Sequence, residues 1–342
     1  MAYLVLYILL AALCIPNLRF APANMDIKTT MDRMNRLRFI FAIFIVFTHC
    51  TLPYEYLPHI LLPLRKVSTF GVGYFFTLSG YGLAYSAAHK PDYLRGFWKK
   101  IANLVWLTAF SSVVSMLIKN IAFGGGEALR MINWYMPAMI ALYLIFYVGY
   151  SIFPESKWMR NVFLVGAVLV IMGVICGIDN LTGLNHRNYY ISELAFPFGV
   201  LLYEYSDVIA GFMKKKWAVL LIIAAEIVVG GAALVVPEKS LPYLLLHNLM
   251  LIPVELLMIW VLDKVEINNV ILRTMSRYSL FVYLFQFPIL EILKRWYITN
   301  ERPFDVLWFL GCLGLTCVLA VALQTVYDFA GKALHKNLSS KH

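Results

Sequence analysis

Two side chains that can do chemistry stand ten residues apart in an apolar stretch, the guanidinium of Arg38 and the imidazole of His49. At about 100° per residue, this spacing amounts to roughly three helical turns plus 20°, so both project from one face of a helix, about 16 Å apart along its axis. Ionisable groups inside such a segment are costly, and those that occur usually face a protein interior or a wet cavity. The pair therefore predicts a functional site, and we expect both groups to face a shared hydrophilic tunnel.

The chemistry of the two groups is complementary. Imidazole is the side chain best suited to accept and return a proton at neutral pH, which makes His49 a candidate general base. The planar fork of donors on Arg38 suits a phosphate or a polarised carbonyl. The structural alternatives are an interior histidine bonded to a backbone carbonyl and an arginine that anchors a helix end at the membrane surface.

The elements that position this pair must be membrane helices. Of the 342 residues, 61% are hydrophobic and only 14% are charged, and the mean hydropathy is +0.73. A soluble core could not hide that much apolar surface, whereas windows of about 20 apolar residues cross a bilayer. We expect spans at 2–18, 37–53, 69–88, 101–118, 133–153, 161–178, 191–205, 217–236, 243–262, 278–293 and 306–328.

The formal charge of +10 reflects topology more than a nucleic-acid partner. Most of the Lys and Arg residues fall in alternate connections, and the positive-inside rule places those connections in the cytoplasm. Anionic lipid headgroups are then the expected partners of these charges, and no nucleic acid is expected. This orientation puts Arg38 at the cytoplasmic surface, His49 in the outer half of the membrane and the carboxyl terminus in the cytoplasm. For residues 2–18 we favour an uncleaved helix over a cleaved signal peptide.

Other residues could support the site. The second predicted core helix carries Phe75, Phe76, Ser79 and Gly80, in a stretch (71–82) whose four glycines and one serine also suit plain helix packing. Two carboxylates, Glu226 and Glu255, lie inside apolar runs and must find a partner or be protonated. Either could orient His49 as the carboxylate of a catalytic triad does. The five Cys and seven His residues are scattered, so no metal site is predicted.

These motifs resemble the membrane-bound acyltransferase 3 family of bacterial O-acyltransferases. Its Arg-x10-His pattern matches Arg38 and His49, and its Phe-Phe-x-x-Ser-Gly pattern matches residues 75–80. Residues 93–101, 134–138 and 279–288 also look similar to family segments, in the same order. One departure is Gln286, which follows Tyr283 where members often have a histidine. The resemblance runs from about residue 32 to residue 328.

The resemblance implies an enzyme that takes an acyl group, acetyl by default, from cytoplasmic acyl-coenzyme A and delivers it to a sugar hydroxyl on the outer face of the plasma membrane. His49 would act as general base, although a transient acyl-imidazole is also chemically feasible. Acyl-coenzyme A would be a co-substrate, with no permanently bound cofactor. Arg38 would bind the thioester or a phosphate, and a basic mouth would bind the nucleotide end of the donor, formed by Arg33, Arg36, Arg95, Lys99 and Lys100.

We therefore expect an all-α, polytopic membrane helix bundle with ten core transmembrane helices and one amino-terminal helix. The expected divisions are an amino-terminal helix and connection over 1–31, an acyltransferase membrane domain over 32–328 and a cytoplasmic tail over 329–342. The main alternative is a transporter or flippase of a lipid-linked glycan, in which Arg38 and His49 line the substrate path. Such proteins often show internal repeats, and none is evident here. A non-catalytic membrane subunit is a third alternative.

Overall fold

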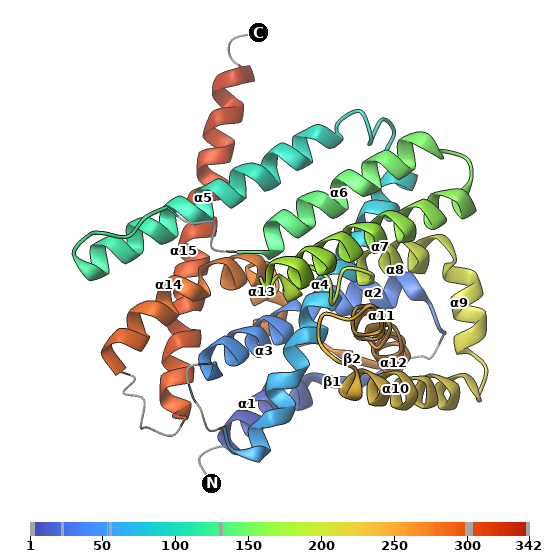
Figure 1. The fold of residues 1–342 in the computed structure, drawn as a ribbon, viewed down its shortest axis with the longest axis horizontal. Helices are drawn as coiled ribbons and strands as arrows, with labels where there is room; N and C mark the ends of the chain where they lie inside the picture. The colour runs from blue at the N-terminus through green and yellow to red at the C-terminus, as the bar shows by residue number, and fades with distance from the viewer. Residues whose placement is uncertain are drawn as a thin grey trace.

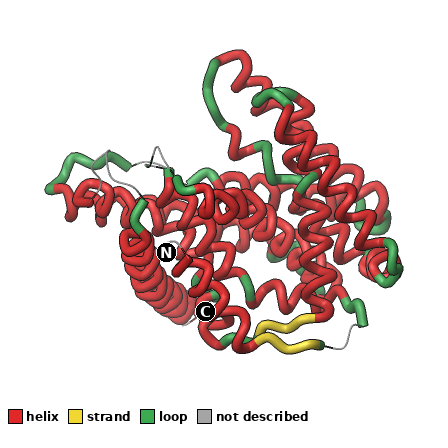
Figure 2. The backbone as a smooth tube through the Cα atoms, turned by 90° about the horizontal axis from the view of Figure 1, so that it is seen from below, coloured by secondary structure: helices red, strands yellow, loops and turns green. Residues whose placement is uncertain are grey.

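The fold is almost entirely helical, in agreement with the all-α prediction (Figure 2). The computed structural model describes residues 4–21, 24–52, 54, 57–129, 133–297 and 304–339. Its helices are α1 Leu4–Cys14, α2 Ile27–Arg36, α3 Arg38–Thr51, α4 Leu62–His89, α5 Phe97–Phe123, α6 Tyr135–Ile152, α7 Lys157–Thr182, α8 Ala195–Glu204, α9 Ser206–Met213, α10 Ala218–Val235, α11 Leu241–Leu249, α12 Leu251–Lys264, α13 Val270–Met275, α14 Ser279–Tyr297 and α15 Val306–Ser339, with 3-10 turns at Ile15–Asn17, His59–Leu61 and Arg187–Tyr189.

Several helices are long and apolar enough to cross a membrane. Within the described residues there are six, and the bent pair of α2 and α3 makes up to seven. This supports a multi-pass membrane protein but does not reach the predicted ten core spans. One predicted span, 191–205, contains α8, which has only ten residues and a length of about 15 Å. Its residues from Ala195 to Val200 are all buried, so this apolar helix is covered by protein.

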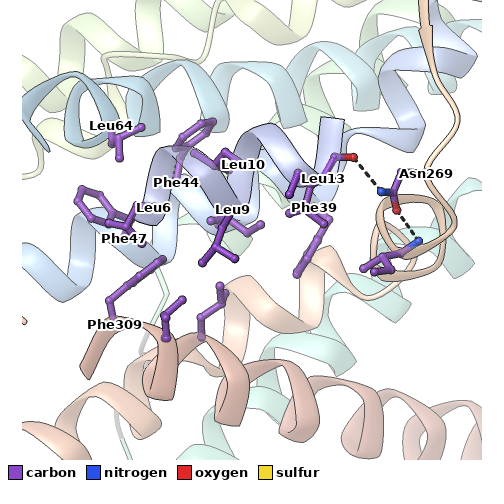
Figure 3. Close-up of a pocket in the computed structure, with 15 residues that line it drawn as sticks. Leu6, Leu9, Leu10, Leu13, Phe39, Phe44, Phe47, Leu64, Asn269 and Phe309 are labelled. Carbon is purple, nitrogen blue, oxygen red and sulfur yellow. Dashed lines mark hydrogen bonds between the residues drawn. The ribbon is translucent and has the colours of Figure 1, made fainter. Parts of the chain in front are cut away.

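Two short strands tie the amino-terminal segment to the body. β1 (Leu18–Phe20) pairs antiparallel with β2 (Val265–Ile267), and Figure 2 shows them as a small ribbon at one edge of the helices. α1 packs near α3 and α15 over an apolar cavity of about 370 Å3 (Figure 3). There the side-chain amide of Asn269 donates to the carbonyl of Leu13 at 2.8 Å. The described part of segment 1–31 is therefore held by contacts with distant parts of the chain.

The carboxyl-terminal helix extends past the expected boundary of the membrane domain. α15 continues without a break to Ser339, whereas the tail was expected to start at residue 329. In Figure 1, α15 (red) runs steeply past α5 and α14, and its upper end extends beyond the other helices.

A bend between α2 and α3 places Arg38 at the start of a helix. The two helices meet at Leu37 with an angle of 47°. Ser276 occupies this break, because its hydroxyl donates to the carbonyl of Arg36 at 2.7 Å and accepts from the backbone N–H of Phe39 at 3.2 Å. Breaks of this kind are stable only where such partners replace the lost helical hydrogen bonds. Arg38 is thus the first residue of α3.

α4 and α8 cross in close contact within the core. A Cβ atom added to Gly80 would lie 2.1 Å from the carbonyl oxygen of Phe196, and one added to Gly199 would lie 2.1 Å from the carbonyl oxygen of Thr77. The two glycines therefore let the two backbones touch, as small residues do in membrane bundles. Gly80 of the Phe-Phe-x-x-Ser-Gly segment is explained by this contact.

Candidate functional site

His49 lies near the carboxyl end of α3 and faces α14. Its Nδ1 atom is 3.0 Å from Oε1 of Gln286. The ring also contacts the edge of Phe287, with centroids 4.7 Å apart, and it interacts with the carbonyl of Ile45 one turn earlier. Gln286, the residue that departs from the family pattern, is therefore the hydrogen-bond partner of the His49 imidazole.

The hydrogen bonds of Gln286 determine which ring nitrogen carries the proton. Its Nε2 atom donates to the carbonyl of Tyr283 at 2.9 Å, so Oε1 must be the atom that faces His49. An amide oxygen can only accept, which makes Nδ1 of His49 the donor. In neutral histidine the other nitrogen, Nε2, then keeps its lone pair. This is the tautomer that a general base requires.

A cavity of about 570 Å3 adjoins His49. It is open to the outside of the molecule and is lined by polar as well as apolar residues of α3, α4 and the segment before α8. The polar and aromatic part of the lining comprises Thr48, Arg65, Lys66, Ser68, Thr69, Trp134, Arg187, Asn188, Ser192 and Tyr283. A sugar-sized molecule fits this volume.

Buried polar residues hold the segment that closes one side of this cavity. The side chain of Asn248 accepts from the backbone N–H of Leu194 at 3.0 Å and donates to the carbonyl of Tyr190 at 2.9 Å. Asp179 accepts from the backbone N–H of His186 at 2.6 Å and from the hydroxyl of Tyr190 at 3.2 Å. These contacts fix the segment that presents Arg187, Asn188 and Ser192.

Arg38 lies among tyrosines at the opposite end of α3. Its charge interacts with the hydroxyl groups of Tyr74, Tyr135 and Tyr143. Its Nε atom is buried without a hydrogen-bond partner among the described residues. A buried donor without a partner is unusual in a folded protein, so an acceptor from a ligand would satisfy it. Ser79 hydrogen-bonds with Tyr135 and with Tyr143 and thereby orders this group.

Aromatic side chains lie between Arg38 and the cavity at His49. Tyr135 interacts with Arg38, and its ring centroid lies 5.0 Å from that of Tyr283, which lines the cavity at His49. Arg38 itself does not line that cavity. The cavity at His49 thus does not extend to Arg38, and packed tyrosines lie between the two, so the described residues do not form the expected shared tunnel.

Of the remaining motif residues, the two phenylalanines pack against the same aromatic group. Phe76 is fully buried and stacks on Tyr135 with centroids 5.1 Å apart, and Phe75 contacts the edge of Tyr74 at 6.2 Å. The Phe-Phe-x-x-Ser-Gly segment thus surrounds the tyrosines beside Arg38 and packs α4 on α8.

Two of the five residues predicted for a basic mouth bind other parts of the protein. Arg33 donates through Nη1 to the carbonyls of Leu262 and Asp263 at the end of α12. Arg36 forms an ion pair with Glu266 of β2 at 2.7 Å. Both side chains therefore hold α2 in place.

The other three residues of that group lie around the start of α5. Arg95 pairs with Asp92 at 2.9 Å on an exposed surface, Lys99 is exposed, and the ammonium group of Lys100 lies 5.0 Å from the ring centre of Tyr93. Their role in donor binding stays a prediction.

The two candidate carboxylate partners lie elsewhere. Glu255 is buried on α12 and accepts from the hydroxyl of Thr77, and its Oε1 atom has no partner among the described residues. Glu226 lies on α10, where one of its oxygens is near Gly230. Nδ1–H of His49 donates instead to the amide oxygen of Gln286.

Several site residues were not singled out from the sequence. Asn248 and Asp179 are polar residues within apolar helices, which was the available signal, since such residues are costly unless they bond. Arg65, Lys66 and Ser192 gave no local signal, because their importance comes from facing the same cavity as His49.

A comparison with known protein families found one that matches this chain. The model of an acyltransferase domain family, acyltransferase 3, matches residues 31–325, which is nearly the whole chain. Comparisons with curated proteins and with solved structures returned no match.

Proposed function

This chain belongs to the acyltransferase 3 family of membrane acyltransferases. We propose that it transfers an acyl group, by default acetyl, from cytoplasmic acyl-coenzyme A to a sugar hydroxyl on the other side of the membrane. The observation that carries the proposal is the Gln286–His49 hydrogen bond, which leaves Nε2 of His49 as an acceptor beside an outward cavity. A sugar hydroxyl is a weak nucleophile, so its attack requires a base at this kind of position.

The proposed reaction needs only the acceptor hydroxyl, the thioester and the imidazole of His49. The hydroxyl oxygen attacks the thioester carbonyl, and its proton passes to Nε2 of His49. The C–S bond then breaks as the C–O bond is completed, and the imidazolium returns the proton to the departing thiolate of coenzyme A. Gln286 keeps the ring in one tautomer, and its amide oxygen accepts from Nδ1–H throughout the transfer. A two-step route through acyl-His49 remains the competing mechanism.

Arg38 is suited to the donor side of this reaction. It is the first residue of α3, where the helix dipole also favours negative charge. A buried Nε atom without a partner among the described residues and a fixed positive charge together suit a diphosphate or a polarised thioester carbonyl. For direct transfer, the intact thioester would reach from the side of Arg38, past Tyr135 and Tyr283, to place its carbonyl beside His49.

The membrane orientation belongs to the same proposal. Placing the more basic connections in the cytoplasm puts Arg38 on the side of acyl-coenzyme A and His49 on the side of the acceptor, with the carboxyl terminus in the cytoplasm. The membrane would be the plasma membrane, and the acceptor a polysaccharide or lipid-linked glycan. Arg95, Lys99 and Lys100 would then contact the nucleotide end of the donor at the cytoplasmic face.

A direct test follows radiolabelled acetyl-coenzyme A in purified full-length protein. We expect label to appear on a glycan acceptor, and His49→Ala to lower kcat by at least about 100-fold, the range typical of losing a general base. His59→Ala, in the exposed turn before α4, is the matched control and should keep normal turnover. Retained turnover in both His49→Ala and Arg38→Ala would refute the assignment, and transport of unmodified glycan by His49→Ala would favour a flippase.

A further inference from the structure

The cavity beside His49 has a strong charge asymmetry. Arg65, Lys66 and Arg187 all line it, and no Asp or Glu is among the described residues that do so. These three cations come from two separate parts of the chain, the start of α4 and the turn before α8. Their convergence on one cavity is therefore a property of the fold.

Two other basic residues on the side of the molecule that we assign to the exterior, Lys119 and Lys239, already have partners. Lys119 binds Glu127 at 3.1 Å and Glu291 at 3.0 Å, and Lys239 donates to the carbonyl of Leu184 at 2.8 Å. In contrast, the described residues supply no carboxylate within ion-pair distance of Arg65 or Lys66. Two of the three cations beside His49, Arg65 and Lys66, therefore lack a carboxylate partner among the described residues.

Arg187 is only partly satisfied. Its Nη1 atom contacts Glu238 at 3.2 Å near the surface, while its Nε atom is buried without a partner among the described residues. The hydroxyl of Ser192, which also lines the cavity and is 1% exposed, has no partner there either. Buried donors without partners cost free energy unless a ligand or water supplies an acceptor.

The remaining lining suits a sugar ring. Trp134 offers a flat apolar surface of the kind that packs on pyranose rings, and Thr69 and Asn188 add polar groups. Cationic and neutral donors therefore line a volume of about 570 Å3 together with His49. Such a site favours a ligand that has both hydroxyl groups and negative charge.

The geometry points to an anionic acceptor: a sugar whose carboxylate or phosphate is bound by Arg65, Lys66 and Arg187 while one of its hydroxyl groups faces Nε2 of His49. This inference deepens the proposed function and rests on it for the fate of that hydroxyl. Binding of the anion itself requires no turnover, so it can be measured independently of acyl transfer.

The experiment compares matched sugars by equilibrium binding to the full chain in nanodiscs of neutral phosphatidylcholine. The probes are an oligogalacturonide, its carboxyl-reduced neutral counterpart and a hexose 1-phosphate. We expect at least one anionic probe to bind about 10-fold or more tightly than the neutral sugar, with a preference that shrinks as salt is raised. The two anionic probes distinguish a carboxylate from a phosphate as the recognised group.

Charge-removing variants test the location. Arg65→Gln, Lys66→Gln and Arg187→Gln should each raise the Kd of the preferred anionic probe about 10-fold, as expected for a lost charge-assisted hydrogen bond. Lys294→Gln is the matched control, since this exposed lysine of α14 does not line the cavity. Equal binding of the neutral and both anionic probes, or an unchanged Kd in all three variants, would overturn the inference.

The two proposals fail in different ways. If labelled acetyl is transferred in a His49-dependent manner to neutral sugars as readily as to anionic ones, the charge inference is wrong while the acyltransferase mechanism stands. If anionic sugars bind at the three cations but no acyl group is transferred to any acceptor, the proposed reaction is wrong and the anion site stands.

Discussion

Nδ1 of His49 and Oε1 of Gln286 lie 3.0 Å apart, although 237 positions separate the two residues in the sequence. The carbonyl of Tyr283 fixes the amide of Gln286, and the amide in turn fixes the imidazole. An imidazole that acts as a base usually has such a partner behind it, often a carboxylate. Here a neutral amide takes that position, so the partner sets the tautomer without adding a negative charge.

Replacing Gln286 should separate orientation from packing. Gln286→Leu keeps most of the volume but removes the acceptor for Nδ1–H, so we expect kcat to fall about 10- to 100-fold, with a smaller change in the KM for acyl-coenzyme A. Gln286→His restores the pattern that is common in the family and can still accept a hydrogen bond, so it should keep most of the activity. Initial rates with labelled acetyl-coenzyme A measure both. Equal losses in the two variants would show that packing, and not the hydrogen bond, is what matters at this position.

The contact between α4 and α8 makes a prediction about stability. Gly80→Ala and Gly199→Ala each place a methyl group 2.1 Å from a backbone oxygen, so the helices must move apart, at a cost of about 1–3 kcal/mol or more. Thermal unfolding of the solubilised protein should therefore occur at lower temperature. Gly82→Ala, two residues further along α4 with nothing within 4 Å of the added atom, should have no destabilising effect. Similar melting temperatures for all three variants would contradict the crossing seen here.

The sequence predicted the positions of most helices, because runs of apolar residues long enough to cross a bilayer are a local property. It could not show that α8 is covered by protein, since an apolar helix covered by other helices has the same composition as one covered by lipid. The positions of Arg38 and His49 at opposite ends of α3 follow from helical spacing, and the structure places them there. The partner of His49 could not be predicted, because periodicity within one helix says nothing about a contact with α14.

A buried ion pair between α7 and α8 gives a third prediction. Glu204 accepts from the guanidinium of Arg160, from Asn161 and from the hydroxyl of Tyr150, and the side chains of the ion pair are only 7% and 2% exposed. Glu204→Ala leaves a buried charge without its partner, which costs about 3–5 kcal/mol. Arg95→Ala removes an exposed pair and should cost at most about 1 kcal/mol. Denaturation of the solubilised variants measures both, and comparable losses would mean that the Glu204 cluster is solvated.

The amino end of α2 provides a prediction about pH. Asp26 caps this helix, and the hydroxyl of Thr29, followed by the backbone N–H groups of Thr29 and Lys28, holds the pKa of the Asp26 carboxyl below its ordinary value. A lowered pKa means that the carboxylate stabilises the fold above about pH 4, where it is charged in both states, and that this contribution is lost as pH falls through the lowered value. Asp26→Asn can still cap the helix but cannot titrate. Wild type should therefore melt slightly above Asp26→Asn at pH 7, with a small gap because solvent screens this exposed carboxylate, and the gap should close below about pH 4. A gap that is constant from pH 7 to pH 3 would mean that the charge of Asp26 does not contribute to the cap.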